Sequence, residues 1–144
     1  IKIARECFDD VIELELEPSQ ESNLPSNVFS IAESTLSETF HPRAICLDGE
    51  VVGFLMYQFG EVGAFDEDEC TIWRFMIDRR RQNHGIGKVA MGLVLDEIRS
   101  HNRCKLVDIY YGPKNTAAKK VYARYGFKEV GRRDDGDIIA ERYI

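Results

Sequence analysis

An apolar run, a glycine turn and an amphipathic helix follow one another in this sequence, and together they constrain the fold most. Residues 71–77 are nearly all apolar, which is typical of an interior strand. The turn at 82–87 leads into a helix whose apolar residues, spaced by three and four, predict one buried stripe that includes Val89 and Leu93. A further strand is predicted at 106–111. A right-handed crossover between the two strands makes them parallel and places the turn at their carboxyl ends.

Two antiparallel hairpins are predicted on either side of this unit. The first joins 44–47 to 51–57 through Asp48-Gly49, a pair that accepts the positive φ angles of a tight turn. The second joins 127–130 to 137–143 around Asp135-Gly136. The sheet is therefore expected to be mixed.

The remaining segments predict a short strand at 1–4 and three more helices. The first helix is expected to be capped by Asp9 or Asp10 and to run to Leu16. After a loop at 18–25, Ser26 is expected to cap a second helix, which His41-Pro42 ends. The third covers 115–125. The order of elements predicts an α/β fold with antiparallel N-terminal strands, a central parallel β-α-β unit and a C-terminal hairpin.

Length and composition restrict the class of protein. The 144 residues show no internal repeat and no linker, so a single domain over 1–144 is expected. A net charge of −6 argues against nucleic-acid binding, and the lack of an apolar run of about 18 residues argues against a membrane span. The four cysteines, Cys7, Cys46, Cys70 and Cys104, show no zinc-ligand spacing, so no metal is expected. A cytoplasmic protein with reduced thiols is predicted.

The turn at 82–87 has the composition of an anion site. Gly85 and Gly87 leave no side chain between the backbone N–H groups and a ligand, and the helix dipole adds about half a positive charge. A Walker loop is excluded because Gln82 stands where its first glycine is required and Val89 follows Lys88. The residues of the turn also match a dinucleotide-binding motif. The surrounding sequence excludes it, because only 57 residues follow Gly87 and antiparallel strands precede it.

Two motifs together resemble the GCN5-related N-acetyltransferase (GNAT) family. Gln82-Asn83-His84-Gly85-Ile86-Gly87 matches the family's Gln/Arg-x-x-Gly-x-Gly/Ala loop. Asn115, Ala118 and Tyr122 match its Asn-x-x-Ala-x-x-x-Tyr, followed by Gly126-Phe127. The resemblance covers nearly the whole chain. Within the family, 31–34, 52–57 and 121–127 look most like bacterial diamine and polyamine (spermidine/spermine) N-acetyltransferases.

The resemblance implies that acetyl-coenzyme A (acetyl-CoA) is the cosubstrate and lies in a cleft where the two parallel strands splay apart. The backbone at 75–77 would pair with the pantetheine arm, and 82–88 would hold the pyrophosphate. The implied coenzyme-binding residues are Phe75, Met76, Ile77, Gln82, Asn83, His84, Gly85, Ile86, Gly87, Lys88, Asn115 and Ala118. The basic run at 79–81 either steers the phosphates or decorates the surface.

Acetylation of an amine needs an acid and a base. A primary alkyl amine has a pKa of about 10.4 and must lose a proton before it attacks, while the departing thiolate, with a pKa of about 8.5, is helped by a proton donor. Tyr122 is the candidate acid, and its alternative is an aromatic residue of the core. The resemblance implies a carboxylate, as in several polyamine acetyltransferases, at the position where this chain has Trp73, so no base is assigned. Glu33, Asp68 or Glu69 acting through water are the alternatives.

The expected acceptor is a small polyamine or diamine such as spermidine. Five acidic residues between Glu61 and Glu69 could attract a polycation or could be an ordinary solvated loop. The residues expected to bind the acceptor are Glu33, Trp73, Asp68 and Glu69. Other readings are an enzyme that acetylates a protein amino terminus, a lysine or an aminoglycoside, and a module that binds acetyl-CoA without turnover. A homodimer is ordinary for such folds.

Overall fold

The computed structural model describes residues 1–20 and 25–144, and these form two compact units that alternate along the chain. The first unit comprises 1–58 and 74–87, and the second comprises 59–73 and 88–144. Strand β3 (Glu69–Ile77) and helix α3 (Ile86–Ser100) each continue from one unit into the other. The single domain expected over 1–144 stays a prediction. The loop expected at 18–25 includes residues 21–24, which lie outside the described residues.

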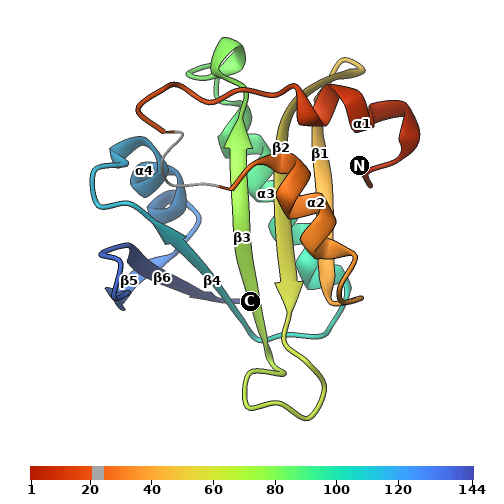
Figure 1. Ribbon diagram of the computed structural model, residues 1–144. Coiled ribbons are helices and arrows are strands. Elements are labelled where there is room, and N and C mark those ends of the chain that lie inside the picture. Colours follow the sequence, from red (N-terminus) through yellow and green to blue (C-terminus); the bar gives the residue numbers. More distant parts are fainter. Residues whose placement is uncertain (21–24) are drawn as a thin grey trace. The chain divides into compact units, whose positions relative to one another are not determined.

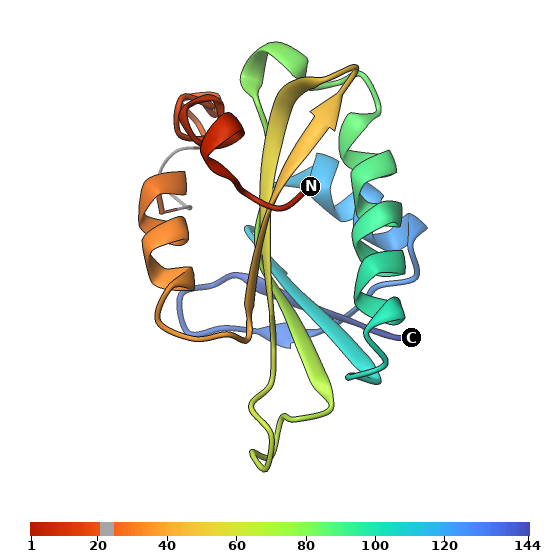
Figure 2. The same cartoon turned by 90° about the vertical axis from the view of Figure 1, so that its right-hand side faces the viewer.

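The first unit is built on a hairpin of β1 (Phe40–Leu47) and β2 (Glu50–Phe59). The strands pair antiparallel, with Leu47 opposite Glu50, and the turn has positive φ at both Asp48 (51°) and Gly49 (82°). The hairpin prediction is therefore confirmed. Helix α2 (Asn27–Ser34) packs against β1 and against α1 (Arg5–Ile12), and both helices lie on one side of the hairpin (Figures 1 and 2).

The boundaries predicted for the N-terminal elements were partly wrong. Helix α1 begins at Arg5, before Asp9, and ends at Ile12, and it buries Cys7 and Val11. The strand expected at 1–4 is reduced to one bridge between Lys2 and Arg43. Ser26 does cap α2, since its side chain accepts a hydrogen bond from the Phe29 N–H (3.1 Å). That helix ends at Ser34, well before His41-Pro42, because these two residues already belong to β1.

The second unit holds the parallel pair and the closing hairpin. Residues 69–72 of β3 pair parallel with 106–109 of β4 (Leu106–Tyr111). Strand β4 pairs antiparallel with β6 (Ile138–Tyr143), which pairs antiparallel with β5 (Lys128–Arg132). The strand order is β1-β2-β3-β4-β6-β5, so the predicted mixed α/β architecture is confirmed. Helix α4 (Thr116–Arg124) and α3 lie on the same side of β4 and β6 (Figure 2).

Helix α3 buries a face that the sequence placed slightly wrongly. The buried residues are Ala90, Met91, Val94, Leu95 and Ile98. Val89 and Leu93, expected in the buried stripe, are 62% and 66% exposed. The hydroxyl of Tyr125, at the end of α4, donates to the Lys88 carbonyl (2.7 Å), and a Cβ at Gly92 would lie 2.8 Å from that hydroxyl. Gly92 therefore leaves room for Tyr125 on α3. In the described residues, no helix combines the length and apolarity needed to span a membrane.

Candidate active site

The connection between β3 and α3 is held by a buried carboxylate. Asp78 is 1% exposed and accepts hydrogen bonds from the backbone N–H groups of Arg80 (2.9 Å) and Glu15 (3.1 Å) and from the Arg80 guanidinium (2.8 Å). Burial alone would raise the pKa of Asp78. The hydrogen bonds from Arg80 and Glu15 outweigh burial and lower that pKa to about 2. Asp78 therefore fixes the end of β3 as a permanent anion.

The basic run after Asp78 is paired with acids of the same unit. The three residues form a short 3₁₀ helix, η2 (Arg79–Arg81). Arg79 lies 2.6 Å from Glu15, Arg80 bonds Asp78, and Arg81 bonds Glu50. The sequence left open whether these residues steer phosphates or decorate the surface. Arg79 and Arg81 thus link the connection to other parts of the first unit, whereas Arg80 pairs within the connection.

The glycine turn takes a conformation that few residues other than glycine and asparagine adopt. Asn83 (φ 63°) and Gly85 (φ 76°) both have left-handed backbone angles. Gln82 anchors the start of the turn, because its side-chain amide donates to the Ile77 carbonyl (3.0 Å) and to the Gln20 side chain (2.9 Å). The His84 ring lies 3.4 Å from the Arg81 carbonyl. The turn is thus tied to the end of β3.

The geometry of this turn fits a phosphate group. A Cβ built at Gly85 would meet nothing within 4 Å, so no protein atom crowds the backbone at this point. Gly87 lies in the first turn of α3, which is 15 residues long, and N–H groups in a first helical turn lack partners within the helix. A Cβ at Gly87 would lie 3.6 Å from Ile77 and 3.7 Å from Phe75, which is ordinary contact. Met76, the third residue expected on this strand, is buried.

Helix α4 carries the second set of expected residues. Asn115 caps the helix, since its side-chain oxygen accepts from the Ala118 N–H (3.1 Å). Tyr122 is 6% exposed, and its ring packs edge-on against Tyr111 (5.2 Å between centroids) and Phe127 (6.0 Å). Burial, and secondarily the neighbouring Tyr111, raises the pKa of Tyr122. The phenol therefore stays protonated at neutral pH, as a proton donor must.

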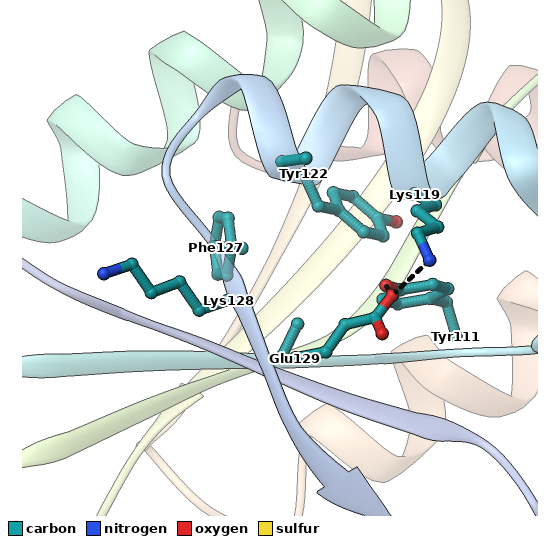
Figure 3. A pocket seen from close by; sticks show the side chains of 8 residues that line it. Tyr111, Lys119, Tyr122, Phe127, Lys128 and Glu129 are labelled. Atoms are coloured by element: carbon teal, nitrogen blue, oxygen red, sulfur yellow. Dashed lines mark hydrogen bonds and ion pairs between the residues drawn. The ribbon is translucent and has the colours of Figure 1, made fainter.

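A pocket of about 380 Å³ borders Tyr122 in the second unit (Figure 3). Glu129 of β5 accepts hydrogen bonds there from the Tyr111 hydroxyl (2.8 Å) and the Lys119 ammonium (2.9 Å). Burial and the bond to Glu129 raise the pKa of Tyr111 to about 12. Glu129 thus links α4 to β4 beside Tyr122. The pocket is lined by Tyr111, Lys119, Tyr122, Ala123, Phe127, Lys128, Glu129 and Ala140.

Two of the residues expected to bind the acceptor form ion pairs within the protein. Glu33 lies 3.5 Å from Arg74, and Asp68 pairs with Lys105 (2.5 Å). Trp73 instead contacts the ring of Tyr110 (5.7 Å). The pKa of Glu69 is raised by burial first and then by the nearby carboxylates of Asp108, Asp66 and Glu141. Their roles in binding an acceptor stay predictions.

Sequence reasoning missed two buried carboxylates. Asp78 directly precedes three arginines, and an acid in that position is a signal for local pairing. Asp108, 6% exposed, is held by the Thr71 hydroxyl at 2.8 Å. A lone polar residue in an otherwise apolar strand was the signal for it. Among the described residues, no group of three or more metal-ligating side chains occurs.

Comparison with known proteins agrees with this architecture. Residues 8–127 match the acetyltransferase (GNAT) family. The spermine/spermidine N(1)-acetyltransferase of Bacillus subtilis (strain 168) is 27% identical over 128 residues, which are 86% of this chain and 83% of that protein.

Two solved structures share the fold at low sequence identity. The ribosomal-protein-S18-alanine N-acetyltransferase of Escherichia coli is 18% identical, with a TM-score of 0.77. The match covers 100% of this chain and 92% of that protein's chain. The PaiA N-acetyltransferase of Thermoplasma acidophilum, solved with coenzyme A, is 15% identical, with a TM-score of 0.74. The match covers 100% of this chain and 97% of that protein's chain. Since the family match spans most of the sequence, this chain belongs to the GNAT family and is an acetyl-CoA-dependent N-acetyltransferase.

Proposed function

We propose that this enzyme acetylates a primary amine of a polyamine or diamine such as spermidine or spermine. The observation that carries the proposal is the crowding of carboxylates around Glu69, whose pKa is raised by burial and then by Asp108, Asp66 and Glu141. A multiply charged amine would relieve this repulsion. The relative named spermine/spermidine N(1)-acetyltransferase supports the same class of acceptor.

The coenzyme would be held by backbone groups. In the first unit, we expect the backbone at 75–77 to pair with the pantetheine arm and the N–H groups from Gln82 to Gly87 to bind the pyrophosphate. In the second unit, Lys88, Asn115 and Ala118 are the expected contacts. Acetyl-CoA, when bound, supplies the thioester whose acetyl group is transferred.

Tyr122 is proposed to give its hydroxyl proton to the departing thiolate. The Tyr122 phenol is protonated at neutral pH, as a proton donor must be, while burial raises its pKa and so makes it a weaker acid than an exposed tyrosine. Its packing between Tyr111 and Phe127 restricts the ring to one orientation. Trp73 is proposed to line the acceptor side, next to Tyr110. Glu33 and Asp68 are expected to act through the ion pairs in which they already take part.

The test is release of coenzyme A thiol across a panel of acceptors: spermidine, spermine, a diamine, butylamine, a lysine peptide and a peptide with an amino-terminal alanine. We expect kcat/KM for spermidine to exceed that for butylamine by at least about tenfold at low ionic strength. Physiological salt should reduce this ratio, because screening acts on encounter and binding. Equal values for spermidine and butylamine, without salt dependence, would refute the polyamine proposal. A preference for either peptide would replace it with a protein acceptor.

A further inference from the structure

The second unit contains a buried carboxylate, Asp108, to which no proton-transfer step has been assigned so far. Asp108 lies in β4, where side chains alternate between the two faces of the sheet. Tyr111 contacts Tyr122 of α4. Asp108 precedes Tyr111 by three residues and Tyr110 precedes it by one, so this alternation assigns both to the opposite face of the sheet. Asp108 is only 6% exposed. A buried carboxylate on the face of β4 opposite to α4 needs hydrogen-bond partners on that face.

Partners of Asp108 come from the two strands of the parallel pair. Thr71 of β3 is its register partner, and the Thr71 hydroxyl donates to a carboxylate oxygen of Asp108 at 2.8 Å. The hydroxyl of Tyr110 interacts with the same carboxylate. The Tyr110 ring in turn contacts Trp73 at 5.7 Å between centroids. The ring of Tyr110, whose hydroxyl meets a fixed carboxylate, therefore lies next to the tryptophan.

This arrangement matches what the amine must do before it reacts. At pH 7, an alkyl amine with a pKa of about 10.4 is neutral in only about one molecule in 10³, so a group that takes up its proton would speed the reaction considerably. Tyr110 alone is a poor acceptor, since its hydroxyl already carries a proton. A phenol that passes that proton to a carboxylate while taking one from an ammonium group solves the problem.

We propose that Tyr110 and Asp108 together accept the proton that the acceptor amine loses. One N–H bond of the ammonium breaks and a new O–H bond forms at Tyr110, while the original Tyr110 proton moves to Asp108. The products are a neutral amine with its lone pair, an unchanged phenol and a protonated Asp108, which later returns the proton to solvent. Tyr110 is the catalytic residue of the pair, and Asp108 is a positioning residue that acts through it. The step rests on the proposed function only in requiring an alkyl amine as acceptor.

Other ionisable groups face this pair and must be separated from it by experiment. Glu69 and Cys70 of β3 interact with Asp108. Glu141 of β6 is the register partner of Asp108, and the Arg133 guanidinium lies over the Tyr110 ring at 4.7 Å. Glu141 is also one of the carboxylates expected to attract a polycation, so the control variant is Asp96→Asn, which removes an exposed carboxylate of α3 and leaves the pair intact.

The test compares two amines that differ in pKa. For spermidine at pH 7, Asp108→Asn and Tyr110→Phe should each lower kcat/KM by about 10²-fold, and the double variant should lose little more. For a fluorinated alkylamine with a pKa near 7, the loss should be under about threefold, because solvent already supplies the neutral amine. In both variants, log kcat/KM for spermidine should rise with a slope of about 1 between pH 7 and 9.

Controls keep the outcome decisive. Asparagine can still accept the Thr71 hydrogen bond, and Tyr110→Phe keeps the ring contact with Trp73, so melting temperature and coenzyme binding should stay close to those of the parent. Asp96→Asn should keep the parent's ratio of kcat/KM between the two amines. Equal losses for the two amines in both variants would show that the pair is structural, and no loss for spermidine would refute the proposal. A failure of the polyamine proposal would appear separately, in the acceptor preference of the parent enzyme.

Discussion

The two ends of strand β3 hold carboxylates in opposite electrostatic environments. At its carboxyl end, in the first unit, Asp78 is buried, but hydrogen bonds from Arg80 and Glu15 lower its pKa to about 2. At its amino end, in the second unit, burial and three other carboxylates raise the pKa of Glu69. The first environment favours the anion and fixes a backbone connection. The second disfavours the anion and leaves a negative potential that a cationic ligand can neutralise.

The same contrast applies to the proposed roles in coenzyme binding, catalysis and acceptor binding. In the first unit, the arginines of the connection are paired with carboxylates of that unit, and the backbone of the turn is expected to bind the coenzyme. In the second unit, Tyr122, Tyr110 and the carboxylates near Glu69 are expected to carry the chemistry and hold the acceptor. Substitutions in the connection between β3 and α3 should therefore change coenzyme affinity or stability, and substitutions of Tyr122, Tyr110 and Glu69 should change turnover or acceptor specificity.

The largest expected effect is on turnover in the second unit. Tyr122→Phe should lower kcat by about 10²–10³, the usual scale for loss of a positioned acid, because the ring still packs against Tyr111 and Phe127 but has no proton to give. Coenzyme affinity, measured by calorimetry, should remain within about twofold of the parent. An unchanged kcat in an assay limited by chemistry would return Tyr122 to the role of a core aromatic residue.

The next largest effect is on coenzyme binding in the first unit. Gly87→Glu places a carboxylate at the start of α3, where it would occupy and repel the phosphate position, and we expect acetyl-CoA affinity to fall by about 10²-fold or more. Gly87→Ala is the matched control. Its methyl group would make only ordinary contacts with Ile77 and Phe75, so affinity should change by less than about threefold. Retained affinity in a folded Gly87→Glu protein would exclude this turn as the phosphate site.

A smaller effect concerns the stability of the connection. The lowered pKa of Asp78, from 3.8 to about 2, corresponds to about 2 kcal/mol of folding stability that is present above pH 4 and is lost as the pH falls toward 2. Asp78→Asn should therefore lower the free energy of unfolding by about 2 kcal/mol at pH 7, measured by urea titration. The difference from the parent should shrink between pH 4 and pH 2.

The exposed pair of Asp96 and Arg99 offers the control for this prediction. Asp96→Asn removes a carboxylate whose side chain is 74% exposed, and it should cost less than about 0.5 kcal/mol. If both variants lost the same stability, the hydrogen bonds of Asp78 would contribute no more than a surface ion pair.

Local signals predicted the parts of the fold that depend on neighbours in sequence. Asp48-Gly49 gave the first hairpin, and Ser26 gave the start of α2, because a tight turn and a helix cap need only a few adjacent residues. The stripe on α3 was misplaced at Val89 and Leu93 because its buried face depends on residues distant in sequence, such as Tyr125. Periodicity gives the helix but not the exact direction of its buried face.

The candidate site shows the same limit. The glycines of the turn and the residues of α4 could be named from their motifs, because each motif is a local segment. The partners of the charged side chains could not, since Arg79 pairs with Glu15, Arg81 with Glu50 and Arg74 with Glu33, all far away in the sequence. The pairing of Thr71 with Asp108 likewise required the register of β3 against β4.

The smallest expected effect is that of Glu69→Gln, and its effect on stability contrasts most directly with that of Asp78→Asn. Glu69→Gln removes one of several repelling carboxylates, so the free energy of unfolding at pH 7 should stay equal or rise, the opposite sign to Asp78→Asn. The reason is that a group with a raised pKa contributes stability that is lost as the pH rises through its folded-state value. At the same time, kcat/KM for spermidine should fall several-fold at low ionic strength, while that for butylamine should change little.

Asp68→Asn is the matched control, because the Asp68 carboxylate is already paired with Lys105 and should attract a polycation less. Its effect on kcat/KM for spermidine should be smaller than that of Glu69→Gln, and physiological salt should erase most of the difference between them. A loss of stability in Glu69→Gln would contradict the electrostatic contrast between the two ends of β3. Equal responses of spermidine and butylamine would contradict a role of Glu69 in recognising a polycation.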